Sequence, residues 1–120
     1  MKAEIKSLHS LQVEDSLINY QPEDEKNFGT WIRASIGPEA EAGSESFDIL
    51  VCTPDWLKLQ CAIEGPMWGR HMLIVETYDY DAIKSAIARY VAQVAETEWA
   101  AIAAKLSRIG AWEFEDYRDR

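Results

Sequence analysis

The stretch SFDILVCTPDWL, residues 46–57, joins a strand pattern directly to a helix start. Alternation along a strand sends successive side chains to opposite faces. Thr53 can cap the helix, Pro54 suits its first position, and Asp55 complements the positive end of the helix dipole. The stretch therefore predicts a strand followed at once by a short helix, which Gly65-Pro66 must end. The predicted strand faces are Phe47, Ile49 and Val51 on one side, and Asp48, Leu50 and Cys52 on the other.

Two more strands are predicted upstream of this stretch. Residues 28–38, FGTWIRASIGP, alternate in the same way, and the polar segment 39–46 fits a hairpin loop. Residues 2–9 form a first strand with Ala3, Ile5 and Ser7 on one face, and 10–27 form a loop. One face of the 28–38 strand is expected to carry Phe28, Thr30, Ile32, Ala34 and Ile36.

Downstream, residues 71–78, HMLIVETY, predict a fourth strand, and their apolar character favours a central position. A helix is expected from Asp79 to about Glu96, with Asp79 or Asp81 as its cap and apolar residues at helical spacing. Thr97 then offers the cap of a second helix, which Gly110 can end in a left-handed conformation.

Strands at the front of the chain and long helices at the back favour an α+β fold. We expect a single domain over residues 1–120, with a mostly antiparallel sheet of about four strands and helices packed on one face. The helix over 53–63 is long enough to connect one parallel pair of strands.

The charge balance narrows the class of partner. The chain has 120 residues, 48% of them hydrophobic, and a net charge of −9 from 21 acidic and 12 basic residues. Such a charge repels nucleic acid and anionic membranes and attracts cationic partners. The sequence starts without the pattern of a secretory signal and has no apolar run of membrane-spanning length, so we expect a cytoplasmic protein with reduced thiols.

Residues suited to catalysis or metal binding are few, and we expect no cofactor and no metal. Zinc sites usually have ligands in close pairs, whereas Cys52 and Cys61 lie nine positions apart. Cys52 and His71 can form a nucleophilic pair if their strands are neighbours. Glu76 is the acid expected to be partly buried, most simply in a salt bridge with Arg33, Arg70 or Lys84.

The closing segment SRIGAWEFEDYRDR mixes aromatic and acidic residues. Trp112 and Phe114 are expected to pack on the sheet or on the preceding helix, since large rings are costly to leave in water. The acids between and after them, Glu113, Glu115 and Asp116, are expected to face solvent.

Several segments, in this order, resemble the immunity protein 8 family of bacterial polymorphic toxin and contact-dependent inhibition systems. They are MKAEIKSLHS, PEDEKNFGTWIRASIGP, ESFDILVCTPDWL, GRHMLIVETYDYDAIKSAI and LSRIGAWEFEDY. The resemblance implies a small α+β protein that binds one toxin domain tightly and blocks it. Toxins of such systems are often nucleases, which are cationic where they hold phosphate. No functional residue transfers from the family.

We therefore expect an immunity protein that neutralises a toxin domain with a basic surface by direct, noncatalytic binding. The alternatives are a small enzyme that uses Cys52 and His71 or Glu76, and a structural or oligomerising subunit. The residues expected to contact the toxin lie in two acidic loops, although exposed acids that only aid solubility explain them as well. They are Glu23, Asp24 and Glu25, and Glu39, Glu41 and Glu45.

Overall fold

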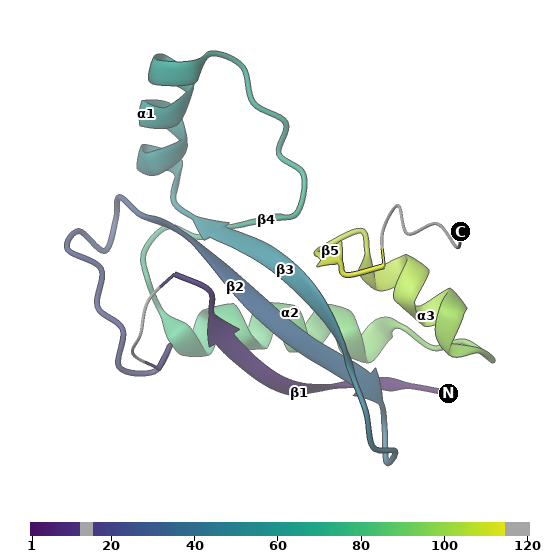
Figure 1. The fold of residues 1–120 in the computed structure, drawn as a ribbon. Coiled ribbons are helices and arrows are strands. Elements are labelled where there is room, and N and C mark those ends of the chain that lie inside the picture. Colours follow the sequence, from purple (N-terminus) through teal and green to yellow (C-terminus); the bar gives the residue numbers. More distant parts are fainter. Residues whose placement is uncertain (13–15, 115–120) are drawn as a thin grey trace.

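The computed structural model describes residues 1–12 and 16–114 and shows a mixed sheet backed by helices (Figure 1). Within these residues the sheet has five strands in the order β1-β2-β3-β4, and β5 also pairs with β3. The predicted α+β class is confirmed. The strands are β1 (Ala3–Ser10), β2 (Gly29–Pro38), β3 (Glu45–Cys52), β4 (Met72–Ile74) and β5 (Ala111–Trp112); the helices are α1 (Pro54–Glu64), α2 (Tyr80–Gln93) and α3 (Trp99–Leu106).

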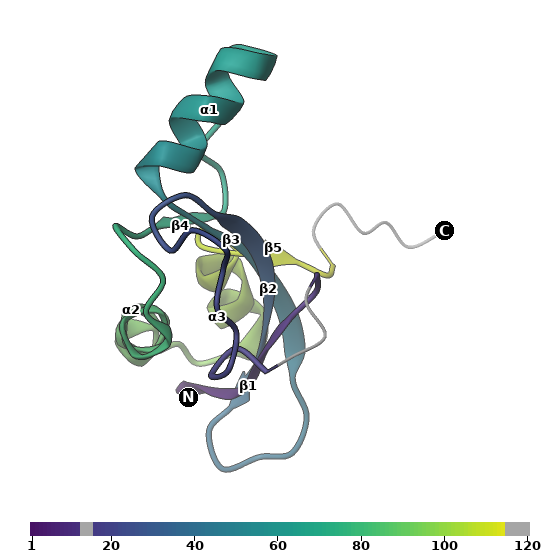
Figure 2. The ribbon, with the colours of Figure 1, turned by 90° about the vertical axis from the view of Figure 1, so that its left-hand side faces the viewer.

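The core lies between one face of β2 and β3 and the two helices α2 and α3. The strands pair antiparallel, with Ile32 opposite Ile49 and Ala34 opposite Phe47, so their apolar positions share a face. Figure 2 shows α2 and α3 on the same side of this sheet. Both predicted apolar faces are confirmed as buried. The helices add Ile83, Ile87 and Val91 from α2, and Ile102, Ala103 and Leu106 from α3.

The alternation predicted for β1 fails halfway along the strand. Ile5 lies opposite Ile36, but the register shifts between Ile5 and Ser7, and Leu8 then pairs with Ala34. This bulge adds one residue to β1, and an extra residue reverses the faces of those that follow. Leu8 therefore packs against the core, while Ser7 is exposed.

The fourth strand is shorter than predicted and is not central. β4 has three residues, pairs parallel to β3, and stands last in the strand order. β5 pairs with Phe47 and Asp48 on the same edge of β3, and β3 itself ends at Cys52, opposite Ile74, so β4 occupies only the part from Leu50 to Cys52. The predicted parallel pair joined through a helix is confirmed as β3 and β4.

The start of α2 matches the prediction, but α2 ends at Gln93 and not near Glu96, and both ends of α3 differ from the prediction. Asp79 caps α2 by accepting a hydrogen bond from the backbone N–H of Ala82 at 3.2 Å. Glu98, not Thr97, occupies the cap position of α3, and its side chain makes no capping bond in the described structure. Gly110 is not a left-handed stop either. It is buried, and a Cβ there would lie 2.9 Å from the Cβ of Phe47.

The segment after α3 packs against the sheet as expected. Trp112 in β5 stacks on Phe47 with ring centroids 6.5 Å apart, and its Nε1 donates to Glu45 at 2.5 Å. Phe114 meets Trp112 edge to face at 5.6 Å but remains 41% exposed. Glu113 accepts a hydrogen bond from the backbone N–H of Ser46 at 2.7 Å. Glu115, Asp116 and Tyr117 lie outside the described residues.

Helix α1 has the predicted ends and an unexpected position. Thr53 accepts a hydrogen bond from the N–H of Trp56, and the N–H of Gly65 bonds to the carbonyl of Cys61. The helix projects beyond the sheet in both views (Figures 1 and 2). None of its eleven residues, all of which the structure describes, is buried. Helices on one face of the sheet are thus confirmed by α2 and α3, whereas α1 stands apart from that layer.

The two cysteines have opposite environments. Cys52, at the end of β3, is fully buried, and this burial raises the pKa of its thiol. Cys61 is exposed on α1. At neutral pH Cys52 therefore stays protonated and closed to reagents.

Replacing Gly110 with alanine should destabilise the protein by about 1–3 kcal/mol, because the new methyl group would press on Phe47. Urea unfolding measures the loss. Gly69→Ala is the matched control, since a Cβ there meets nothing within 4 Å, and it should change stability by less than about 1 kcal/mol. Equal losses in the two variants would contradict the close approach of Gly110 to Phe47 in β3.

A thiol titration with DTNB should find one fast-reacting cysteine in the native protein and two in denaturant. Cys61→Ser should abolish the fast phase, because the remaining thiol of Cys52 is buried. Rapid reaction of the native Cys61→Ser variant would show that the end of β3 is open to solvent.

Candidate functional site

The six acidic residues predicted to contact a partner separate into two groups at opposite ends of the sheet. Glu23, Asp24 and Glu25 lie in the loop before β2, near α1. Glu39 and Glu41 lie in the β2–β3 turn, and Glu45 begins β3 (Figure 1). Because β2 has ten residues, the groups are roughly 30 Å apart. They form two separate surfaces.

The group at the β2–β3 turn is partly used by the fold itself. The carboxylate of Glu45 accepts the indole N–H of Trp112, which holds β5 on β3. Lys6 donates to the carbonyl of Glu41 at 2.8 Å and to the side chain of Glu4 at 2.6 Å, and the pKa of the Glu4 carboxyl is lowered by this bond. Glu45 thus has a structural role at this end, and Lys6 places a positive charge beside the turn.

The group before β2 sits on an anchored backbone. Asp24 accepts the N–H of Lys26 at 2.9 Å, and the carbonyl of Glu25 accepts the N–H of Tyr78 at 2.9 Å. The side chains of Glu23, Asp24 and Glu25 are exposed. A fixed backbone with outward carboxylates presents its charge without first having to order the loop.

Two adjoining hollows flank these acids. One has a volume of about 560 Å³, and the other, of about 800 Å³, opens beside the first turn of α1. Both include Tyr20, Pro22, Glu23 and Glu25 in their walls, so the loop forms a ridge between them. The walls of the first hollow also include Tyr78 and Tyr80, and those of the second include Phe28, Gly29 and Trp56.

Tyrosines hold this ridge in place. Tyr78 packs edge-on against Tyr20 with centroids 5.0 Å apart and against Phe28 at 5.4 Å. Its hydroxyl donates to the carbonyl of Leu17 at 2.5 Å. Burial, with smaller contributions from Tyr20 and Tyr80, raises the pKa of Tyr78 to about 12, so this hydroxyl keeps its proton. Acidic and aromatic groups therefore share one preformed surface, and such groups suit recognition of cationic side chains.

The proposed cysteine–histidine pair lies on neighbouring segments but is not arranged for nucleophilic catalysis. The N–H of Leu50 bonds to the carbonyl of His71, which places His71 beside β3. The Nε2 of His71 lies 2.9 Å from the carbonyl of Ser107, to which it can only donate. Cys52 is fully buried and its pKa is raised, whereas a nucleophilic thiol needs a lowered pKa.

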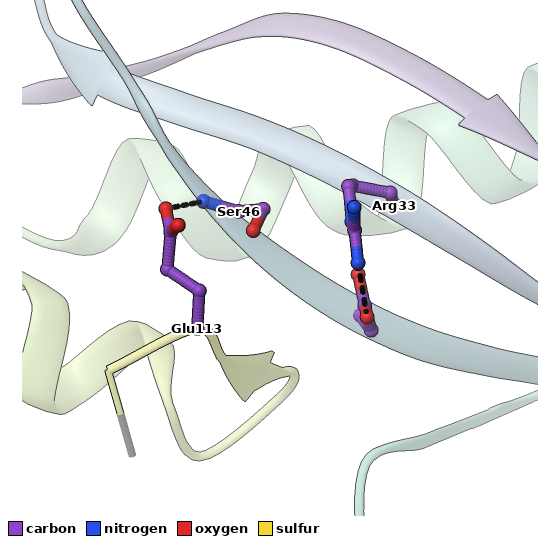
Figure 3. Close-up of polar contacts among 4 residues, drawn as sticks. Arg33, Ser46 and Glu113 are labelled. Carbon is purple, nitrogen blue, oxygen red and sulfur yellow. Dashed lines mark hydrogen bonds and ion pairs between the residues drawn. The ribbon is translucent and has the colours of Figure 1, made fainter. Parts of the chain in front are cut away.

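Glu76 differs from its prediction. It is exposed and lies after the end of β4, not partly buried in a central strand. Its candidate partner Arg33 pairs instead with Asp48, with bonds of 2.8 and 3.0 Å. This bond raises the pKa of the Arg33 guanidinium. Figure 3 shows Arg33 in this ion pair and Glu113 reaching the backbone of Ser46, both on the face of the sheet away from the core.

The described part of the chain shows neither a metal-binding group nor a helix able to span a membrane. Residues 1–12 and 16–114 contain no group of three histidine, cysteine or acidic side chains arranged to hold a metal ion. Within the same residues, no helix has the length and apolarity needed to cross a bilayer.

Sequence reasoning missed the apolar residues of α1 and of the loop after it. Leu59 is 48% exposed, Ile63 69%, and Trp68 92%. In the sequence they look like ordinary core residues of a short helix. The available signal was that Lys58 and Gln60 interrupt the apolar positions, so α1 lacks the wide stripe of a core helix.

Comparison with known proteins identifies the family. Neither the curated proteins nor the solved structures gave a match. The model of the family described as Immunity protein 8 matches residues 3–117 of the 120 residues. Since that match covers nearly the whole chain, this protein belongs to the Immunity protein 8 family.

Proposed function

We propose that this chain neutralises a cognate bacterial toxin domain by direct, noncatalytic binding through the end of the sheet that carries Glu23, Asp24 and Glu25. Membership of an immunity protein family supports a toxin as the partner. The observation that carries the choice of surface is the anchored acidic ridge between two hollows. The protein acts in the cytoplasm, where the toxin must be stopped.

The negative charge of the chain supports a toxin domain with a basic surface. A net charge of −9 speeds encounter with a basic surface and disfavours nucleic acid as a direct ligand. A nuclease domain has such a basic surface because it must hold phosphate groups. Carboxylates of the ridge would pair with those cations and cover the path of the substrate.

The environment of each acidic group favours the ridge over the β2–β3 turn. Glu45 is engaged with Trp112, and Lys6 binds the backbone carbonyl of Glu41 while its charge is paired with Glu4. The ridge has aromatic walls on both sides, and interfaces gain most of their affinity from aromatic and arginine anchors. A basic side chain that enters either hollow would meet both a carboxylate and a ring.

The double variant Glu23→Gln/Glu25→Gln should slow association with the toxin domain by about tenfold at low salt, because steering depends on charge. The probe is the C-terminal domain encoded immediately upstream of this chain, and the measurement is the association rate at two salt concentrations. Rescue of cells that express that domain should weaken in parallel.

The matched control is Glu39→Gln/Glu41→Gln, which removes the same two charges from the opposite end of the sheet. It should bind close to the wild-type rate. A control that loses as much as the ridge variant would show that overall charge, and not this surface, steers the partner. A wild-type protein that neither binds nor protects against the toxic domain would overturn the pairing itself.

A further inference from the structure

We propose that α1 is a hydrophobic anchor: Leu59 and Ile63 insert into an apolar groove of the toxin domain whose rim carries lysine or arginine. This inference rests on the proposed function and adds to it the element that holds the toxin and the chemistry of the toxin surface. Helix-in-groove binding of this kind uses apolar side chains three or four residues apart on an exposed helix.

The two anchor residues share one side of α1. They are four residues apart, a spacing that places side chains one above the other on a helix. Leu59 is 48% exposed and Ile63 69%. Trp68, in the loop that follows α1, is a further apolar residue that is 92% exposed. Apolar side chains grouped in this way on a soluble protein mark an interaction surface.

The fold does not need these side chains in the core. No α1 residue, in a helix that the structure describes throughout, is buried. The helix is held at its base, where a Cβ on Gly29 would come within 2.4 Å of the Trp56 indole, so ring and backbone are in direct contact. The caps at Thr53 and Gly65 satisfy both ends. An eleven-residue helix is marginal alone in water, and a groove that covers Leu59 and Ile63 would stabilise it.

The negative charge around α1 favours a basic protein as the partner that binds it. Asp55 lies in the first turn of α1 and Glu64 at its end, and Lys58 lies beside Leu59, so α1 carries two acids and one base. The hollow beside Trp56 is walled by the acidic ridge. A second copy of this chain would bring the same acids and another nine negative charges to the contact. A basic protein surface meets complementary charge at each of these acids.

The helix alone is too small to form a whole interface. A helix of eleven residues is about 16 Å long, whereas a standard interface buries about 800 Å² on each partner. Because the ridge and its hollows adjoin the base of α1, they supply the polar part of the same interface. The anchor provides apolar contact that persists after encounter, and the acids provide steering.

The test compares two double variants for binding to the purified C-terminal domain encoded immediately upstream. Leu59→Gln/Ile63→Gln removes the anchor and keeps good helix formers. Ala88→Gln/Ala92→Gln places the same residues at the same spacing on exposed positions of α2. Circular dichroism and thermal melting establish that both variants fold, and Leu59→Ala/Ile63→Ala repeats the test with the best helix former.

The α1 variant should bind at least about tenfold more weakly, mainly through faster dissociation and at both low and high salt, while the α2 variant binds like the wild type. Wild-type affinity in the α1 variant would overturn the anchor but leave the proposed function intact. Failure of the wild type to bind would overturn both. A wild-type dimer in sedimentation that the α1 variant turns into a monomer, with toxin binding unchanged, would assign α1 to self-association and also overturn the anchor.

Discussion

The antiparallel pairing of β2 with β3 is the interaction on which the rest of the structure depends. It sets Ile32 against Ile49 and Ala34 against Phe47, and so creates the one broad apolar face that α2 and α3 cover. β1 extends this pair on one side, while β4 and β5 divide the other edge of β3 between them. Because every other strand of the described sheet pairs with β2 or β3, a change in their register would displace the whole sheet.

Thr53 links the sheet to helix α1, which projects beyond it. Its hydroxyl accepts the backbone N–H of Phe28 at 3.1 Å and also caps α1, and its own N–H bonds to the carbonyl of Phe28. The start of α1 is therefore fixed to the start of β2, beside the acidic ridge. The base of α1, at Trp56, is thereby held next to the ridge, while no residue of α1 is part of the core.

The electrostatic character of the molecule depends on where its acids lie more than on how many it has. Glu45 and Glu113 bond to neighbouring strands, Asp48 pairs with Arg33, and Glu96 pairs with Lys105. These acids serve the fold. Those of the ridge point to solvent between two hollows walled by aromatic rings. Acids that stabilise strands and acids that project into solvent thus look alike in composition and differ only in what they contact.

The sequence by itself determined the elements whose signals are local. Spacing and side-chain chemistry within a few residues predict the strand faces of β2 and β3 and the apolar stripes of α2 and α3. They also predict the Thr53 cap, followed by Pro54, and an aspartate cap for α2. The α+β class followed from their order. Tertiary structure alone decided the rest, because those features depend on competition between distant segments. β4 is short because its partner β3 ends at Cys52, opposite Ile74, and because β5 takes the same edge of β3 before Leu50. Leu8 faces inward because a bulge shifts β1, and Gly110 is required by the approach of Phe47. The six acids could be named from the sequence, but only the fold separated them into two ends and left Leu59 and Ile63 in solvent beside one of them.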